Sequence, residues 1–220
     1  MFDRDTFLEF ENFFYQEHAQ SFVLLPGHGP VMISAPHCVE QLRNGRIKAA
    51  EPQTGALAKM LHHTLGCPVI YKTKNWNDDE NFDENCLYKQ ALSAYINSSD
   101  ILFLLDLHQL APHRKMNVAI GTGKHKNVSR QAFINATIEA FCEKKITKIK
   151  IDDPFGATYP FTVSSYIAST CGISCLQIEI NSKILRLDTE DSQTEQVFEA
   201  LVDSVKKLTL LLQEEKHETT

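Results

Sequence analysis

The fold is decided by an almost wholly apolar stretch, Ile101-Leu102-Phe103-Leu104-Leu105-Asp106-Leu107-His108. A continuous apolar run of this kind is typical of a central strand that is covered on both faces by helices. Two other runs have the same character, Val31-Met32-Ile33-Ser34 and Cys175-Leu176-Gln177-Ile178-Glu179. Predicted strands alternate with predicted helices around them, which indicates a parallel or mixed sheet with helices on both faces. We therefore expect an α/β fold with three layers, α/β/α, and a central mixed sheet.

The remaining elements follow from turn signals and from the spacing of apolar residues. Apolar residues at intervals of three and four predict helices, and short apolar runs bounded by glycine or proline predict strands. The predicted helices cover residues 54–65, 85–96, 130–142, 161–170 and 194–215, with a short helix in the first twenty residues. The predicted strands cover residues 22–25, 31–34, 68–71, 101–107, 117–121, 148–151 and 174–180. Residues 38–50 are predicted to be a polar, basic loop. Neither a linker nor an internal repeat is visible, so we expect one domain, residues 1–220.

Composition and charge argue against several classes of protein. The chain has 220 residues, is 43% hydrophobic and carries a net charge of -6 without a long basic run, so we expect no nucleic-acid binding. No stretch of roughly eighteen apolar residues is present, so we expect no membrane-spanning helix. The N-terminus is acidic and lacks the features of a signal peptide, and the six scattered cysteines fit free thiols in a reducing compartment. We expect a cytoplasmic protein.

Polar residues stand at the C-terminal end of three predicted strands. His37 follows the first strand, His108 ends the second, and Glu179 lies late in the third. In open α/β sheets, the carboxyl ends of the strands form the edge where ligands bind. Asp106 and His108 point to the same face of their strand, which is common where a carboxylate supports a metal-binding histidine. Two histidines and a carboxylate can hold a metal ion with an open position, and a second carboxylate can move protons.

Each of these residues also has a simpler interpretation. His37 is consistent with an ordinary hydrogen-bonded loop histidine, and Asp106 with a buried acid that pairs with a basic residue elsewhere. A glutamate in a buried strand is costly unless it is partnered or functional. For Glu179, the alternative to a functional role is a buried salt bridge, with Arg186 as a candidate partner.

The third metal ligand has two candidates. His37 and Glu40 form an H-x-x-E pattern, a spacing that occurs in zinc sites but also often arises by chance. Glu51 stands immediately before the predicted helix, where a carboxylate is held rigidly and Thr54 can support it. We favour Glu51, partly on a resemblance described below, and Glu40 stays the rival.

Two arginines are candidates for substrate binding. Arg114 lies six residues past His108, and Arg46 lies in the loop that leads to Glu51. A guanidinium group binds a carboxylate in a two-pronged way and can also stabilise an oxyanion. The simpler interpretation of either residue is a solvated surface arginine.

Four short segments occur in a fixed order along the chain. They are Ser34-Ala35-Pro36-His37, residues 48–55, Asp106-Leu107-His108 and Leu176-Gln177-Ile178-Glu179-Ile180. In these segments the chain resembles the N-formylglutamate amidohydrolase family and, more distantly, zinc carboxypeptidases and phage poly-γ-glutamate hydrolases. The resemblance implies a phosphorylase/hydrolase-like, zinc carboxypeptidase-like fold with one zinc ion (Zn2+) per chain. It further implies that His37, Glu51 and His108 are the metal ligands and that Glu179 is the general base.

The residues and the resemblance together predict a zinc-dependent hydrolase that cleaves an amide C–N bond of an N-acyl amino acid or an acidic peptide. Glu179 is the expected base, Arg114 the expected catalytic and substrate-binding arginine, and Arg46 a second substrate-binding residue. The expected partner is a small-molecule or peptide substrate with an acidic group, and a homo-oligomer is possible. One alternative is a non-catalytic metal- or ligand-binding protein that retains the hydrolase fold. Another is a metal-free α/β protein whose polar residues form buried pairs.

Overall fold

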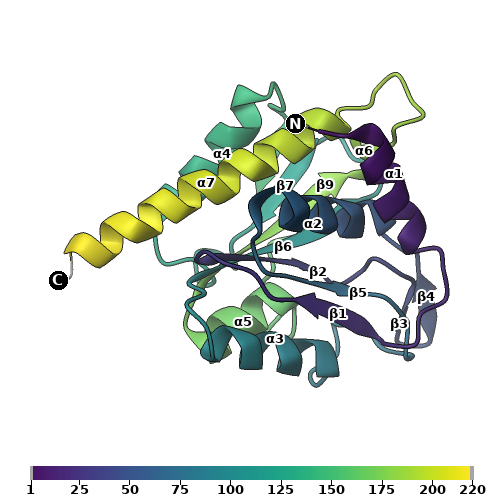
Figure 1. The fold of residues 1–220 in the computed structure, drawn as a ribbon, viewed down its shortest axis with the longest axis horizontal. Helices are drawn as coiled ribbons and strands as arrows, with labels where there is room; N and C mark the ends of the chain where they lie inside the picture. Colours follow the sequence, from purple (N-terminus) through teal and green to yellow (C-terminus); the bar gives the residue numbers. More distant parts are fainter. Residues whose placement is uncertain (1, 219–220) are drawn as a thin grey trace.

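A seven-stranded sheet forms the centre of the computed structural model, which describes residues 2–218 and the side chains of residues 2–215 (Figure 1). Its strands are β1 (Phe22–Leu25), β2 (Val31–Ala35), β5 (Val69–Lys72), β6 (Phe103–Leu110), β7 (Val118–Gly121), β8 (Ile149–Ile151) and β9 (Ser174–Asn181). The strand order is β1-β5-β2-β6-β9-β7-β8. Strands β5, β2, β6 and β9 run parallel, whereas β1 pairs antiparallel with β5 and β7 antiparallel with β9. The predicted mixed sheet is confirmed.

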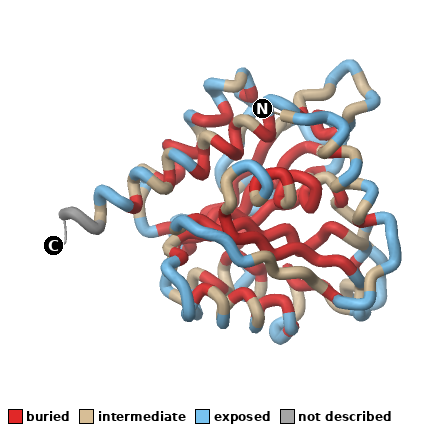
Figure 2. Tube along the Cα trace, viewed as in Figure 1, coloured by how far each residue is buried: buried red, intermediate tan, exposed pale blue. Residues whose placement is uncertain are grey.

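The two longest strands, β6 and β9, lie side by side in the middle of this sheet. They pair in register from Phe103 opposite Ser174 to Leu110 opposite Asn181. Both strands are almost entirely buried, as the red central strands of Figure 2 show. Successive side chains point to opposite faces, so that Leu104 and the adjacent Leu105 belong to two different core clusters. The apolar run is continuous because both faces of the strand pack against helices.

Helices cover the two faces of the sheet unequally. One face packs against α1 (Arg4–Phe13), α2 (Pro52–Leu65), α4 (Gln131–Glu143) and α7 (Thr194–Glu218). The other face packs against α3 (Leu87–Asn97) and α5 (Val163–Cys171), which lie together at the bottom of Figure 1. A short helix, α6 (Ser182–Leu185), follows β9 directly. The arrangement is the expected three-layer α/β/α fold.

The segment 38–50, predicted to be a loop, contains a small hairpin. Its strands are β3 (Gln41–Arg43) and β4 (Arg46–Lys48), which form a separate two-stranded sheet. The connection is Asn44-Gly45, and both residues have positive φ angles, 51° and 73°. Asn-Gly is the preferred pair for a two-residue hairpin turn because both residues tolerate this conformation. The polar composition of the strands concealed the hairpin from a search for apolar runs.

The two central strands extend beyond their predicted ends. β6 continues to Leu110 and β9 to Asn181, so His108 and Glu179 lie inside strands rather than at their ends. The pairing of β6 with β9 continues to the last residue of each strand, and past the two polar residues only Gln109 is partly exposed. The two side chains are therefore held by strand hydrogen bonds on either side.

Helix α2 begins two residues earlier than predicted. Pro52 occupies its first turn, where a missing N–H costs nothing, and Glu51 is the N-cap residue. Thr54 lies in the first turn and donates its hydroxyl to the backbone carbonyl of Glu51 at 2.7 Å. The helix start therefore holds the backbone of Glu51.

The structure also bears on two expectations from composition. All six cysteines are free thiols, as predicted. None of the helices among the described residues is both long enough and apolar enough to cross a membrane.

Candidate metal centre and active site

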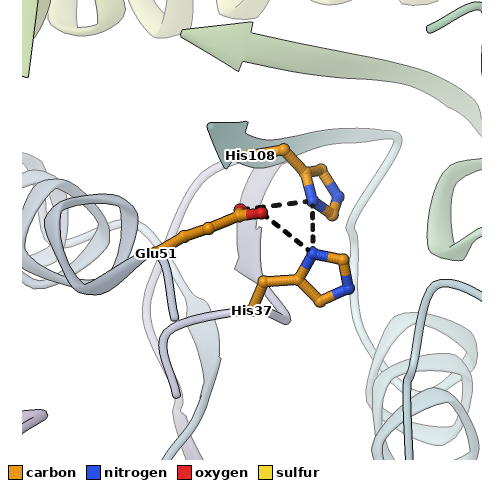
Figure 3. A group of neighbouring side chains, drawn as sticks. All are labelled: His37, Glu51 and His108. Carbon is orange, nitrogen blue, oxygen red and sulfur yellow. Dashed lines mark hydrogen bonds and ion pairs between the residues drawn. The ribbon is translucent and has the colours of Figure 1, made fainter. Parts of the chain in front are cut away.

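Side chains from three separate parts of the chain meet near the C-terminal ends of the central strands β2 and β6 (Figure 3). His37 lies two residues past the end of β2, and His108 lies in β6, the parallel neighbour of β2. Glu51 reaches them from the start of α2, and its backbone N–H donates to the carbonyl of His37 at 2.8 Å. Figure 3 shows the two imidazoles and the carboxylate pointing toward one another. Strand pairing brings the histidines together, and one backbone hydrogen bond brings Glu51 to them.

The spacing of the three donor groups fits a metal ion. Nδ1 of His37 lies 3.2 Å from Nδ1 of His108 and 3.3 Å from Oε1 of Glu51. Nδ1 of His108 lies 3.6 Å from Oε2 of Glu51. Ligand atoms about 2.0–2.1 Å from a tetrahedral metal ion are about 3.3 Å from one another, which matches these edges. Two histidines and one carboxylate leave a fourth position open, as catalytic zinc sites do.

The other nitrogen of each imidazole contacts a buried carboxylate. Nε2 of His37 lies 3.0 Å from Oδ1 of Asp79, and Nε2 of His108 lies 3.1 Å from Oδ2 of Asp106. Both carboxylates are inaccessible to solvent. A carboxylate on Nε2 fixes the ring and directs Nδ1 at the cluster, which is how metal-binding histidines are usually oriented. The expected pairing of Asp106 with His108 is present.

Asp79 is held in place by the acidic loop between β5 and α3. Its Oδ2 accepts a hydrogen bond from Nε of Arg43 at 2.7 Å, and its Oδ1 accepts one from the backbone of Asn81 at 3.1 Å. On either side of Asp79, Asp78 and Glu80 both bond the buried Nζ of Lys72. A buried lysine requires carboxylate partners to compensate its charge, so these contacts anchor the loop on both sides of Asp79. The loop therefore delivers Asp79 to His37 in one fixed position.

The charges of the cluster shift the pKa values of its members in opposite directions. Burial disfavours the charged form of His37, but the charge of Glu51 and the contact with Asp79 outweigh it and raise the pKa of His37. Burial acts in the same way on His108, but Asp106 raises the pKa of this imidazole well above its ordinary value. Burial also opposes ionisation of Glu51, yet the two imidazoles lower its pKa to about 2. A cation bound at the three ligand atoms would replace the histidine protons.

A second carboxylate, that of Glu179, lies beside the cluster in a different environment. Glu179 sits directly opposite His108 in the pairing of β9 with β6 and is 6% exposed. Nε2 of Gln177 donates to Oε1 of Glu179 at 2.9 Å, and the amide of Asn81 donates to Gln177 at 3.4 Å. Burial raises the pKa of Glu179 to about 7, although the charge of His108 opposes the shift. This carboxyl group can therefore gain or lose a proton near neutral pH.

The cluster and Glu179 line one cavity of about 550 Å³, a size suited to a small ligand or a short segment of peptide. Three cationic side chains line its walls, those of Arg43, Lys48 and Arg114. Three aromatic side chains are also present, those of Phe82, Phe155 and Tyr159. The rings of Phe82 and Tyr159 stack with centroids 5.4 Å apart, and the Arg43 guanidinium lies 4.9 Å from the Phe82 centroid. The cavity combines a buried acidic floor with a cationic and aromatic wall.

The structure bears on two open questions from the sequence, the identity of the third metal ligand and the partner of Glu179. Glu40 is exposed just before β3, whereas Glu51 lies in the group of possible metal ligands with His37 and His108. Arg186, the candidate salt-bridge partner of Glu179, instead pairs with Asp188 at 2.9 Å. The geometry therefore favours Glu51 over Glu40 as the third ligand, and among the described contacts Arg186 is not a partner of Glu179.

The two predicted arginines differ in position. Arg114 lines the cavity, and its guanidinium lies 5.6 Å from the centroid of Phe155. Arg46 is exposed on β4 and is not among the residues that line the cavity. Its hairpin partner Arg43 lines the cavity in its place. The substrate-binding role predicted for Arg46 stays a prediction.

Sequence reasoning missed Asp79, Arg43 and Lys48. Asp79 lies in a run of three acids, Asp78-Asp79-Glu80, and nothing in that run distinguishes the buried acid that contacts His37. The Asn-Gly turn was the available signal for the other two, because a hairpin there pairs Arg43 with Arg46 beside the turn and Gln41 with Lys48 at the open end, so Arg43 and Lys48 lie on one face.

Comparisons with known proteins find similarity in structure but not in sequence. No family model matches the chain, and no curated protein matches its sequence. The structure is similar to that of N-formylglutamate amidohydrolase from Ralstonia eutropha JMP134, with a TM-score of 0.61 and 14% identity over 85% of this chain and 97% of that one. A bacteriophage poly-γ-glutamate hydrolase gives a TM-score of 0.54 and 15% identity over 92% and 93%. A metallo-carboxypeptidase from Burkholderia cenocepacia gives 0.53 and 13% over 88% of this chain and 61% of that one.

At these identities the likeness establishes the fold. It confirms the predicted zinc carboxypeptidase-like α/β architecture, and the three neighbours are hydrolases by name. The evidence for the candidate site therefore comes from the residues of this chain alone. The evidence for the fold comes from both the sheet topology and the comparisons.

Proposed function

We propose that this protein is a zinc-dependent hydrolase that cleaves an amide C–N bond of an N-acyl amino acid or an acidic peptide. The proposal rests on the presence of a cluster of metal-ligating groups and a protonatable carboxyl group in one cavity. The three donor groups of His37, Glu51 and His108 have the spacing of a metal centre, and the protonatable carboxyl of Glu179 lies beside them. Amide hydrolysis by a metal-activated water uses both parts.

His37, Glu51 and His108 would hold the metal ion. When bound, zinc supplies a Lewis acid for a carbonyl group and lowers the pKa of a coordinated water molecule to about 7. Glu179 accepts a proton from the attacking water and then delivers it to the leaving amine. Gln177 holds Oε1 of Glu179 through its amide at 2.9 Å, which leaves the other carboxylate oxygen for proton transfer.

The cationic wall of the cavity supports an acidic substrate. Arg114 and Arg43 line the cavity with guanidinium groups, which bind carboxylates in a two-pronged way. Asp79 already engages Nε of Arg43, so the remaining donors of that guanidinium are available to a ligand. Arg114 makes no such ion pair among the described contacts and is the first choice for orienting the acidic group.

The first test is the metal content of the purified protein, measured by elemental analysis. We expect about one zinc per chain in the wild type, loss of zinc in His108→Ala and Glu51→Ala, and retention in Glu40→Ala. Glu40 is the matched control because it is the rival acid and is exposed. Absence of zinc from the wild type after incubation with zinc would refute the proposed mechanism.

The second test is turnover. Wild-type protein and Glu179→Gln would be incubated with a panel of N-acyl amino acids and short acidic peptides, and release of primary amine would be measured. We expect the wild type to hydrolyse acidic members of the panel, and Glu179→Gln to hydrolyse them about 10²–10⁴-fold more slowly. Zinc binding without hydrolysis of any amide would instead favour a binding protein that retains the hydrolase fold.

A further inference from the structure

A groove with largely apolar walls lies beside the C-terminal half of α7, outside the candidate active site. Its volume is about 490 Å³. The walls come from the end of α2 and the residues after it, from the start of β2 and from one side of α7. The apolar side chains among them are Val31, Leu65, Cys67, Val205 and Leu210. We call this surface the apolar groove.

Leu210 stands out among these residues because its side chain is 59% exposed. Leu208 and Leu212, which flank it in α7, are both buried. Among residues 194–215, the part of α7 whose side chains the structure describes, no other large hydrophobic residue is exposed to this degree. Helix α7 runs along the outside of the molecule and projects past the sheet at its C-terminal end (Figure 1). Leu210 and the apolar groove therefore form one accessible apolar patch, the kind of surface that marks an interaction site.

Two charged residues flank Leu210 along the same stripe of α7. Lys206 precedes it by four residues and Glu214 follows it by four, and all three side chains are exposed. Residues four apart lie on the same side of a helix, about 6 Å apart along its axis. Neither Lys206 nor Glu214 has an ion-pair partner among the residues that the structure describes, whereas the adjacent Lys207 pairs with two glutamates of α4 at 2.9 and 3.0 Å. The stripe thus carries one cation and one anion at equal distances from an exposed leucine.

This stripe is complementary to itself when two copies of α7 pack antiparallel. A two-fold axis at Leu210 places residues that lie equally far before and after it opposite each other. Lys206 of each copy then faces Glu214 of the other copy, so that two ion pairs form. The two Leu210 side chains meet at the axis, each beside the apolar groove of the other copy. A parallel arrangement in the same register would instead place like charges opposite each other.

The apolar groove and the metal cluster lie at opposite ends of β2. Val31, which lines the groove, is the first residue of this strand, and His37 lies two residues past its last residue. The strand is roughly 16 Å long. No residue that lines the apolar groove also lines the active-site cavity. A partner on the groove therefore leaves the cavity open, and the interface can be tested separately from the proposed activity.

We propose that the apolar groove and the stripe Lys206, Leu210 and Glu214 form the interface of a homodimer, in which the two α7 helices lie antiparallel across a two-fold axis at Leu210. The partner is a second copy of this chain because each charge of the stripe finds its opposite on an identical stripe. Such an interface uses the same patch on both subunits, as two-fold symmetric dimers do.

The first test is sedimentation velocity of the purified full chain from low to high micromolar concentration. We expect dimers in the wild type, and we expect Leu210→Ser to raise the dissociation constant about a hundredfold or more, because two leucines leave the interface. Leu87→Ser on α3 is the matched control, since Leu87 is also exposed, at 54%, and lies outside the groove. It should dimerise like the wild type. Thermal unfolding checks that both variants stay folded.

The second test exchanges the charges of the stripe. Lys206→Glu and Glu214→Lys should each raise the dissociation constant about three- to thirtyfold, because each change replaces two attractive contacts by repulsive ones. The combined variant Lys206→Glu/Glu214→Lys should dimerise like the wild type, because opposite charges face each other again. Added salt should reduce the differences between the variants, since exposed charges are screened.

A wild type that stays monomeric at every concentration would overturn the proposal. An apolar dye that binds this monomer but not Leu210→Ser would then assign the groove to a different apolar ligand. Dimers that resist Leu210→Ser would place the interface elsewhere on the molecule. Dimers that the combined charge exchange does not restore would exclude the antiparallel arrangement, and either result would overturn the proposal as well.

Discussion

Two regions of the cavity shift the pKa of a carboxyl group in opposite directions. Between His37 and His108, Glu51 is surrounded by potential cations, and its pKa falls to about 2. On the neighbouring strand, Glu179 is more deeply buried and its hydrogen-bond donor is the neutral amide of Gln177, so its pKa rises to about 7. The first carboxylate remains charged and suits a cation, and the second exchanges protons. Burial acts on both in the same direction, and the neighbouring charges decide the outcome.

Glu179→Gln should produce the largest effect, because it removes the proton-transfer group and leaves the metal region intact. We expect kcat to fall by about 10²–10⁴-fold, the usual range for loss of a general acid–base group. Zinc content should be unchanged, because Glu179 lies outside the ligand cluster. Loss of zinc together with activity in this variant would mean that Glu179 also supports metal binding. That result would contradict the separate roles of Glu179 and the metal ligands.

Asp79→Asn tests the metal-ligand cluster indirectly, through the carboxylate that contacts the outer nitrogen of His37. Asp79 contacts Nε2 of His37 at 3.0 Å, and loss of such an outer carboxylate typically weakens metal binding by about 10–100-fold. Competition with a chelator gives the zinc affinity directly. Glu84→Gln, an exposed acid of the same loop, is the matched control and should match the wild type. An unchanged affinity in Asp79→Asn would mean that His37 is oriented by its ring packing instead.

The pH dependence of kcat/KM tests the region around Glu179. The base acts only when deprotonated, so the rate should fall by about tenfold per pH unit below its pKa. Because the raised pKa of Glu179 is about 7 and a bound cation lowers it, the limb should lie at or below pH 7. The residual activity of Glu179→Gln should lack this limb. A limb that persists in the variant would assign the titration to another group.

The smallest expected effect concerns the two arginines of the β3–β4 hairpin. Arg43 contacts Asp79 and lines the cavity, so Arg43→Gln should lower kcat/KM several-fold, on the order of 1 kcal/mol for a partly exposed charge. Arg46→Gln is the matched control on the facing strand and should stay within about twofold of the wild type. Steady-state kinetics on the same substrate measures both. The reverse ranking would support the substrate-binding role predicted for Arg46.

Much of the fold could be predicted because hydrophobic periodicity is local. The runs at 101–108 and 174–180 predicted two buried strands, and the alternation of strands and helices predicted the three layers. The exceptions have local causes too. The β3–β4 hairpin is polar and short, so its signal lay in the Asn-Gly turn rather than in any apolar run.

The sequence by itself determined which residues could take part in a metal site. His37, His108 and Glu179 stood out because polar groups in or beside apolar strands require partners or a function. The tertiary structure decided which acid joins the two histidines, since strand pairing and one backbone hydrogen bond place Glu51 there and leave Glu40 in solvent. It also decided that Asp79 supports His37 and that Glu179 has a raised pKa. Those properties depend on distances between residues far apart in the chain and on burial, and neither quantity is encoded in a local pattern of residues.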